Sequence, residues 1–68
     1  MGSFKSTLRE EVDASRDQLV LAVRRDEAAD VHRHGARLAD LLERARRHAI
    51  DTSGWVDPHL LSIARDAV

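Results

Sequence analysis

The sequence contains no cysteine, one proline, three glycines and a single lysine among its 68 residues. Without cysteine, the chain can form neither disulfides nor thiolate metal sites, and it has no thiol nucleophile. So short a chain buries only about 60% of the surface of its unfolded form, and usually needs a metal or a partner subunit. The scarcity of proline and glycine leaves long stretches of helix formers. We therefore expect one small helical domain over residues 1–68, with residues 1–6 flexible.

Neither sign of charge dominates, because 11 basic residues face 12 acidic ones. Nucleic-acid binding needs a basic surface, so this partner is not favoured. No apolar run approaches the roughly 20 residues of a membrane span, and no secretory pattern opens the chain. No two histidines are four apart, the helical spacing of a zinc pair. We expect a cytoplasmic protein with no metal, cofactor or membrane partner.

The first helix is expected over Thr7–His34. Thr7-Leu8-Arg9-Glu10 has the spacing of a capping box, in which the first and fourth residues cap each other. Basic residues in a last turn followed by glycine indicate a helix end, which places the stop at Gly35. One long bent helix through Gly35 is the open alternative, since a glycine inside a helix costs only about 1 kcal/mol.

Two further helices are expected over Ala36–Ile50 and Pro58–Ala67. In the first of these, leucines and alanines recur on one face at helical spacing. In the second, Asp57 caps the helix and Pro58 occupies the first turn, where its missing N–H costs nothing. Trp55 is expected to anchor the intervening loop on the core. The predicted fold is all-α, a long helical hairpin plus a short C-terminal helix, in an oligomer.

The oligomer is expected from the run Leu19–Val23, whose five successive apolar residues cover every side of a helix. Such a helix must be covered on several sides, and a second subunit is the cover that we favour. A short buried strand is the competing interpretation of the same run. The predicted interface between two copies consists of Leu19, Val20, Leu21, Val23, Leu38 and Leu42.

One short motif points to phosphate chemistry. Arg33-His34-Gly35-Ala36-Arg37 reads RHGxR and resembles the signature of the histidine phosphatase superfamily. The resemblance implies His34 as nucleophile and Arg33 and Arg37 as ligands of the phosphate oxygens. A second histidine and an acid are then required, for which His48 or His59 and Asp40, Asp51 or Asp57 are available. The motif covers five residues, and no buried strand precedes it as in that family.

Two functions follow from these observations. The first is a small interaction or regulatory protein that acts through helix packing and self-association with an unknown protein partner. The alternative is a phosphatase or phosphate-binding protein that uses His34 with Arg33 and Arg37, assisted by Asp40 and His48, on a phosphate ester. The helix-stop interpretation of Gly35 explains the same motif without any substrate.

Overall fold

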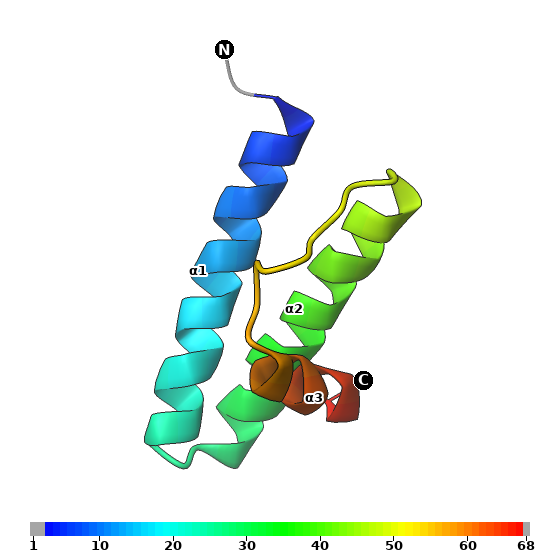
Figure 1. The fold of residues 1–68 in the computed structure, drawn as a ribbon. Helices are drawn as coiled ribbons and strands as arrows, with labels where there is room; N and C mark the ends of the chain where they lie inside the picture. The colour runs from blue at the N-terminus through cyan, green and yellow to red at the C-terminus, as the bar shows by residue number, and fades with distance from the viewer. Residues whose placement is uncertain (1–2, 68) are drawn as a thin grey trace.

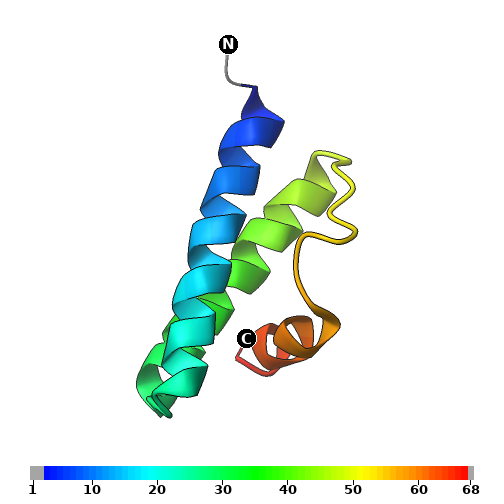
Figure 2. The same cartoon turned by 60° about the vertical axis from the view of Figure 1, so that its left-hand side comes forward.

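The computed structural model describes residues 3–67, which form three helices and no strand. Helix α1 spans Phe4–Arg24, α2 spans Ala28–Arg47 and α3 spans Pro58–Asp66. Helices α1 and α2 form an antiparallel hairpin, and α3 crosses it near the end that carries the turn (Figures 1 and 2). The predicted all-α class, with a long hairpin and a short C-terminal helix, is confirmed.

The core lies between α1 and α2 and is closed by the loop before α3. Its fully buried aliphatic side chains recur at helical spacing, because only such positions face the neighbouring helix. Each contributes roughly 1.5–3 kcal/mol through burial. Trp55 and Val56 of the loop and Ala64 of α3 complete this cluster. The largest fully buried side chains are Leu8, Val12, Leu19, Leu38 and Leu41.

Helix α1 begins earlier than predicted. Ser3 is its N-cap, and the Ser3 hydroxyl accepts a hydrogen bond from the Ser6 N–H at 3.1 Å. The expected start at Thr7 is therefore wrong, because a serine in the preceding turn already supplies the cap. Residues 4–6, which were expected in a flexible segment, belong to the helix, while residues 1 and 2 of that segment lie outside the described residues.

The predicted helix over Thr7–His34 is wrong, because α1 ends at Arg24. The N–H of Glu27 bonds to the Ala22 carbonyl at 3.1 Å, and Asp26 has φ 53°. This is a Schellman ending, in which one residue takes the left-handed conformation. Aspartate tolerates that conformation better than most residues, so the turn forms without a glycine.

Helix α2 ends in the same manner. The N–H of Ile50 bonds to the Ala45 carbonyl at 2.9 Å, and Ala49 has φ 54°. A left-handed alanine has no compensating side-chain hydrogen bond, so its conformation costs about 1–2 kcal/mol. The ending turns Ile50 back onto the last turn of α2, which makes it part of the apolar surface.

Gly35 lies inside α2 and does not end a helix. It is buried where α3 crosses: a Cβ at this position would lie 2.9 Å from the Ala67 Cβ and 3.5 Å from the Ala64 Cα. Glycine is required here by the close approach of two backbones. The predicted boundary between His34 and Ala36 is wrong for this reason.

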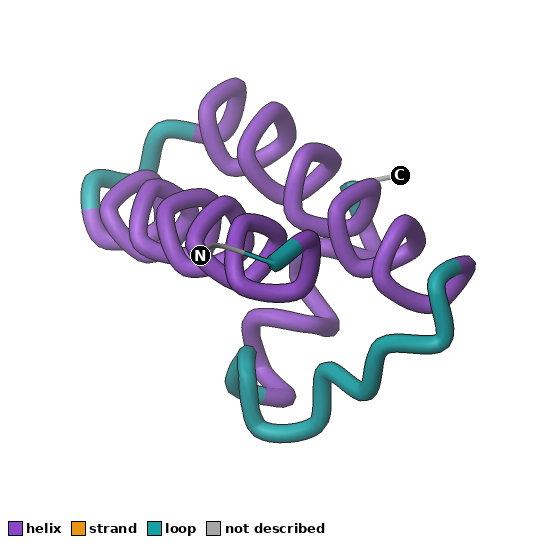
Figure 3. The backbone as a smooth tube through the Cα atoms, turned by 90° about the horizontal axis from the view of Figure 1, so that it is seen from above, coloured by secondary structure: helices purple, strands orange, loops and turns teal. Residues whose placement is uncertain are grey.

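The loop between α2 and α3 is held on α1 by Trp55, as predicted. Figure 3 shows this loop outside the helical hairpin. The Arg9 guanidinium lies 4.9 Å from the Trp55 ring centroid, and Arg16 donates to the Trp55 carbonyl at 3.2 Å. Asp57 then caps α3 by accepting from the His59 N–H at 2.7 Å. These contacts determine where α3 begins.

We expect Ala49→Gly to stabilise the protein by about 0.5–1 kcal/mol. Glycine removes the cost of the left-handed conformation, which exceeds the entropy that it adds to the unfolded chain. Urea unfolding followed by helical circular dichroism measures the change. Ala14→Gly, at an exposed position inside α1, is the matched control and should lose about 1 kcal/mol. Equal losses in both variants would contradict the Schellman ending at Ala49.

We expect Gly35→Leu to destabilise the protein by about 1–3 kcal/mol, because the new side chain meets Ala64 of α3 and Ala67, the C-cap of that helix. Leucine is a better helix former than glycine, so any loss must come from packing between helices. Arg44→Leu, at an exposed position on α2, is the control. The same unfolding measurement applies, and a stability equal to that of the control would show that α3 does not pack on Gly35.

Candidate functional site

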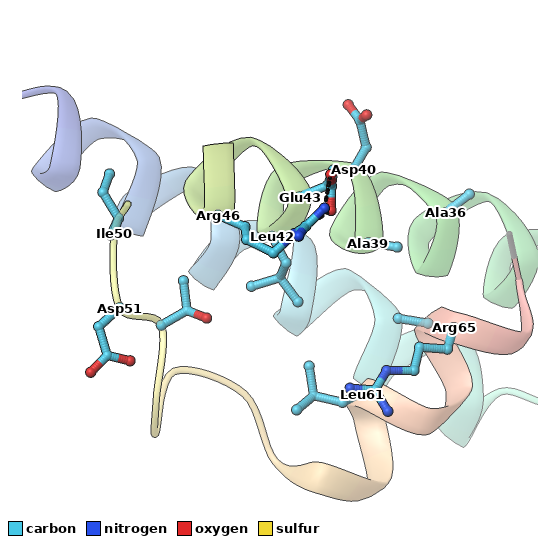
Figure 4. A pocket seen from close by; sticks show the side chains of 12 residues that line it. Ala36, Ala39, Asp40, Leu42, Glu43, Arg46, Ile50, Asp51, Leu61 and Arg65 are labelled. Carbon is cyan, nitrogen blue, oxygen red and sulfur yellow. Dashed lines mark hydrogen bonds and ion pairs between the residues drawn. The ribbon is translucent and has the colours of Figure 1, made fainter. Parts of the chain in front are cut away.

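A concave surface lies between α2 and α3, and we call it the α2–α3 groove (Figure 4). Its volume is about 910 Å³ and it is open to solvent on one side. The floor of the groove consists of three alanines, whose small side chains leave it deep. Leu42, Ile50 and Leu61 are half-buried beside them. The lining residues are Ala36, Ala39, Asp40, Leu42, Glu43 and Arg46 of α2, Ile50, Asp51 and Thr52 of the loop, and Leu61, Ala64 and Arg65 of α3.

One ion pair already occupies the α2 side of the rim. Arg46 forms two hydrogen bonds with Glu43, at 2.7 Å and 3.0 Å, and Arg47 lies 3.7 Å from the same carboxylate. The hydrogen bond from Arg46, assisted by the charges of both arginines, lowers the pKa of Glu43. This carboxylate therefore stays ionised at neutral pH.

Other charges at the rim have no such partner. Asp40 and Arg65 form no ion pair within residues 3–67. Asp51 accepts hydrogen bonds from the hydroxyl and the N–H of Ser53, at 2.6 Å and 2.9 Å, and these bonds lower the pKa of Asp51. The rim therefore presents charges of both signs around an apolar floor.

A second, smaller cleft of about 260 Å³ lies between α1 and α2. Its polar lining comes from Glu11, Ser15 and Gln18 of α1 and from His34 and Arg37 of α2. Ser15 is buried, and its hydroxyl donates to the backbone carbonyl of His34 at 3.5 Å, not to the imidazole. Ser15 is therefore not arranged as a nucleophile activated by a histidine base.

The residues predicted for phosphate chemistry are only partly brought together. His34 and Arg37 line the cleft, whereas Arg33 pairs with Asp30 and is 70% exposed. Asp40 lines the α2–α3 groove instead. His48 caps the end of α2, with its ring centroid 4.5 Å from that of Phe4. Within residues 3–67, the predicted nucleophile, acid and second histidine thus lie at three separate places.

The residues predicted for the interface are also divided. Leu19 and Leu38 are fully buried in the core of the single chain, so they offer no surface to a partner. Val20 is half-buried, while Leu21 and Val23 are 41% and 39% exposed on α1. Leu42 lines the α2–α3 groove. The run Leu19–Val23 is helical, which excludes the alternative strand.

Sequence reasoning missed the groove because α3 had to be placed first. Leu61, Ala64 and Arg65 enter the site only through the crossing of α3 at Gly35. Leu60 and Leu61 are neighbours with the same hydropathy, and both are half-buried, but only Leu61 lines the groove. No signal in the sequence separates these two leucines.

Comparisons with protein families, with curated proteins and with solved structures found no match for this chain. Among residues 3–67, no helix is both long and apolar enough to cross a membrane. In the same described part of the chain, no three histidine or acidic side chains are grouped so as to hold a metal ion. The proposals below therefore rest on the two concave surfaces and their lining.

Proposed function

We propose that this protein is an interaction module that binds an apolar helical segment of a protein partner in the α2–α3 groove. The observation that carries the proposal is the groove itself, with its low alanine floor and half-buried leucines. Small residues let the backbone of a docked helix come close, and the leucines then contact its apolar face. An interaction or regulatory function through helix packing follows from such a surface.

The charges around the groove favour a protein segment over a small ligand. Asp40 and Arg65 bring opposite charges to the rim without a partner among the described residues. An amphipathic helix carries charges of both signs beside its apolar face, so it can satisfy both rim residues. A small ligand with one charged group would leave at least one of them without a counter-charge.

We expect Leu61→Gln to weaken the binding of helical peptides at least about tenfold, a loss of roughly 1.4 kcal/mol. The substitution removes an apolar contact from the groove and leaves the rim charges in place. Peptides are first selected on the wild-type protein from a displayed library of amphipathic helices. Their affinities for the wild type and the variant are then measured by fluorescence anisotropy.

Leu60→Gln is the matched control, because Leu60 is equally half-buried on α3 but does not line the groove. Circular dichroism and thermal unfolding establish whether both variants keep the helical fold. Affinities that fall equally in both variants, or a selection that returns no binder, would contradict the proposal.

A phosphate-binding function is the second candidate, and it is supported by the cleft between α1 and α2. His34 and Arg37 line this cleft together with the Gln18 amide, and all three side chains can donate to phosphate oxygens. Glu11 in the same lining and the outward Arg33 weigh against it. The carboxylate of Glu11 would repel the anion.

If this second function holds, purified protein hydrolyses an aryl phosphate or binds inorganic phosphate, and both His34→Ala and Arg37→Ala abolish the signal. Isotope-edited NMR during a phosphate titration measures binding, and release of the aryl alcohol measures hydrolysis. Arg33→Ala is the control, since its side chain pairs with Asp30 and does not line the cleft. Hydrolysis that is equal in all proteins would indicate a contaminant, and unchanged amide shifts at His34 and Arg37 would exclude the site.

A further inference from the structure

We propose that the helical segment bound in the α2–α3 groove carries its charges on two separate flanks, with basic side chains towards Asp40 and acidic side chains towards Arg65. This inference rests on the proposed function and states the chemistry of the partner. Its starting point is the charge around the groove. Among residues 3–67, the two lining charges that form no ion pair and no side-chain hydrogen bond have opposite signs and belong to different helices.

Asp40 and Arg65 occupy equivalent positions on the two walls of the groove. Asp40 follows Ala36 by four residues on α2, and Arg65 follows Leu61 by four residues on α3. Residues four apart lie on the same face of a helix, about one turn from each other. Each charge therefore lies one turn beyond an apolar residue of the lining. Figure 4 shows Asp40 on the α2 side of the groove and Arg65 on the α3 side.

The other charged side chains of the lining already have partners in their own chain. Arg46 donates two hydrogen bonds to Glu43, which hold the guanidinium and the carboxylate together. The Asp51 carboxylate accepts hydrogen bonds from Ser53. A bound segment that used any of these groups would first have to replace an existing contact. The two remaining rim charges are exposed and need no such exchange, so they are the ones available to a partner.

The α2 wall determines the length of the segment. Its lining residues run from Ala36 to Arg46, a distance of about 15 Å at the rise of an α-helix. A bound helix of about three turns covers this distance. So short a helix is marginal in water, so its order must come from the groove or from the folded protein that carries it. Over three turns, each flank of the helix has only one or two positions that can meet a wall.

An amphipathic helix fits this division of charge between the walls. Its apolar stripe, at least about 100° wide, faces the alanine floor, and the residues on either side of the stripe face the two walls. Lysine and arginine have long flexible stems, so a basic residue on one flank can reach the exposed Asp40 carboxylate at the rim. Arg65 can hold an acidic residue of the other flank through two parallel hydrogen bonds. One segment thus supplies a counter-charge to both residues.

Segments with charges of one sign fit the groove less well. A helix with two basic flanks places one of them beside Arg65, and a helix with two acidic flanks places one beside Asp40. An opposite-charge contact at an exposed rim strengthens binding by up to about fivefold, and a like-charge contact weakens it by a similar factor. Two walls of opposite sign therefore favour a segment with one basic and one acidic flank.

Three versions of a peptide selected on the groove test the proposal. They share one apolar face and differ only at the flanks, which are either one basic and one acidic, both basic, or both acidic. Fluorescence anisotropy measures the affinity of each peptide for the wild type, for Asp40→Arg and for Arg65→Glu. The wild type should bind the mixed peptide at least about threefold more tightly than either of the others.

The two substitutions should change the order of preference in opposite directions. Asp40→Arg gives the groove two basic walls, so the acidic peptide should bind most tightly. Arg65→Glu gives it two acidic walls, so the basic peptide should bind most tightly. The double variant should prefer the mixed peptide again, in the reverse direction, because turning a helix end for end exchanges its flanks. Preferences are compared within each protein, so a general loss of affinity in one variant does not affect the result.

Glu10→Arg and Arg44→Glu are the matched controls. They make the same charge changes as the two test substitutions, at exposed positions that line neither the groove nor the cleft. Both should keep the order of preference of the wild type, and circular dichroism verifies the helical content of every variant. A change of order in the controls as large as in the test variants would reflect net charge alone and overturn the proposal. A wild type that prefers flanks of one sign would also overturn it.

A wrong partner and a wrong function give different results. If Leu61→Gln weakens binding but all variants share one order of preference, the groove binds a helix without distinguishing its charges, and only this inference fails. If binding does not depend on Leu61, or if the selection returns no binder, the proposed function fails and this inference fails with it. A wild type that sediments as a dimer, and dissociates when the peptide binds, would make a second copy the occupant and overturn the stated partner.

Discussion

At Gly35 the backbone of α2 comes so close to α3 that any side chain would meet Ala64 and Ala67. This contact holds α3 across the hairpin near its turn, and it determines where Leu61 and Arg65 lie. Together with the loop anchored by Trp55, the crossing forms one wall of the α2–α3 groove. The candidate site therefore depends on a position that has no side chain, because only glycine allows the two backbones to approach this closely.

The groove and the cleft differ in what their linings can do. The groove combines an apolar floor with charges of both signs, which suits a helical protein segment. The cleft gathers polar groups, but it includes the carboxylate of Glu11 and excludes Arg33. The motif that resembles the histidine phosphatases is thus distributed over two sides of α2. Residues close in the sequence of a helix point in different directions, so a linear motif does not ensure a common site.

The α2–α3 groove is related to the small size of the chain. A domain of 68 residues has little interior, and covering an apolar groove adds buried surface at no cost in chain length. A helical segment of a partner that covers the groove would supply such buried surface. Function and stability would then depend on one surface.

The sequence by itself determined the helical class, the hairpin with its short third helix, the cap at Asp57 and the anchoring of the loop by Trp55. These features follow from local signals: helical periodicity, a capping residue, and one large aromatic side chain near an apolar core.

Only the tertiary structure decided where α1 ends, why Gly35 is a glycine, and which leucine lines the groove. Asp26 and Ala49 take left-handed conformations that glycine would adopt more readily, so the true helix ends carry no glycine signal. Gly35 carries the signal of a helix end but serves a crossing between helices. Leu60 and Leu61 are the same residue type, but only the side chain of Leu61 lines the groove. Which of the two side chains does so depends on how α3 packs against the hairpin. These features depend on contacts between residues far apart in the chain, and a local sequence pattern contains no information about such contacts.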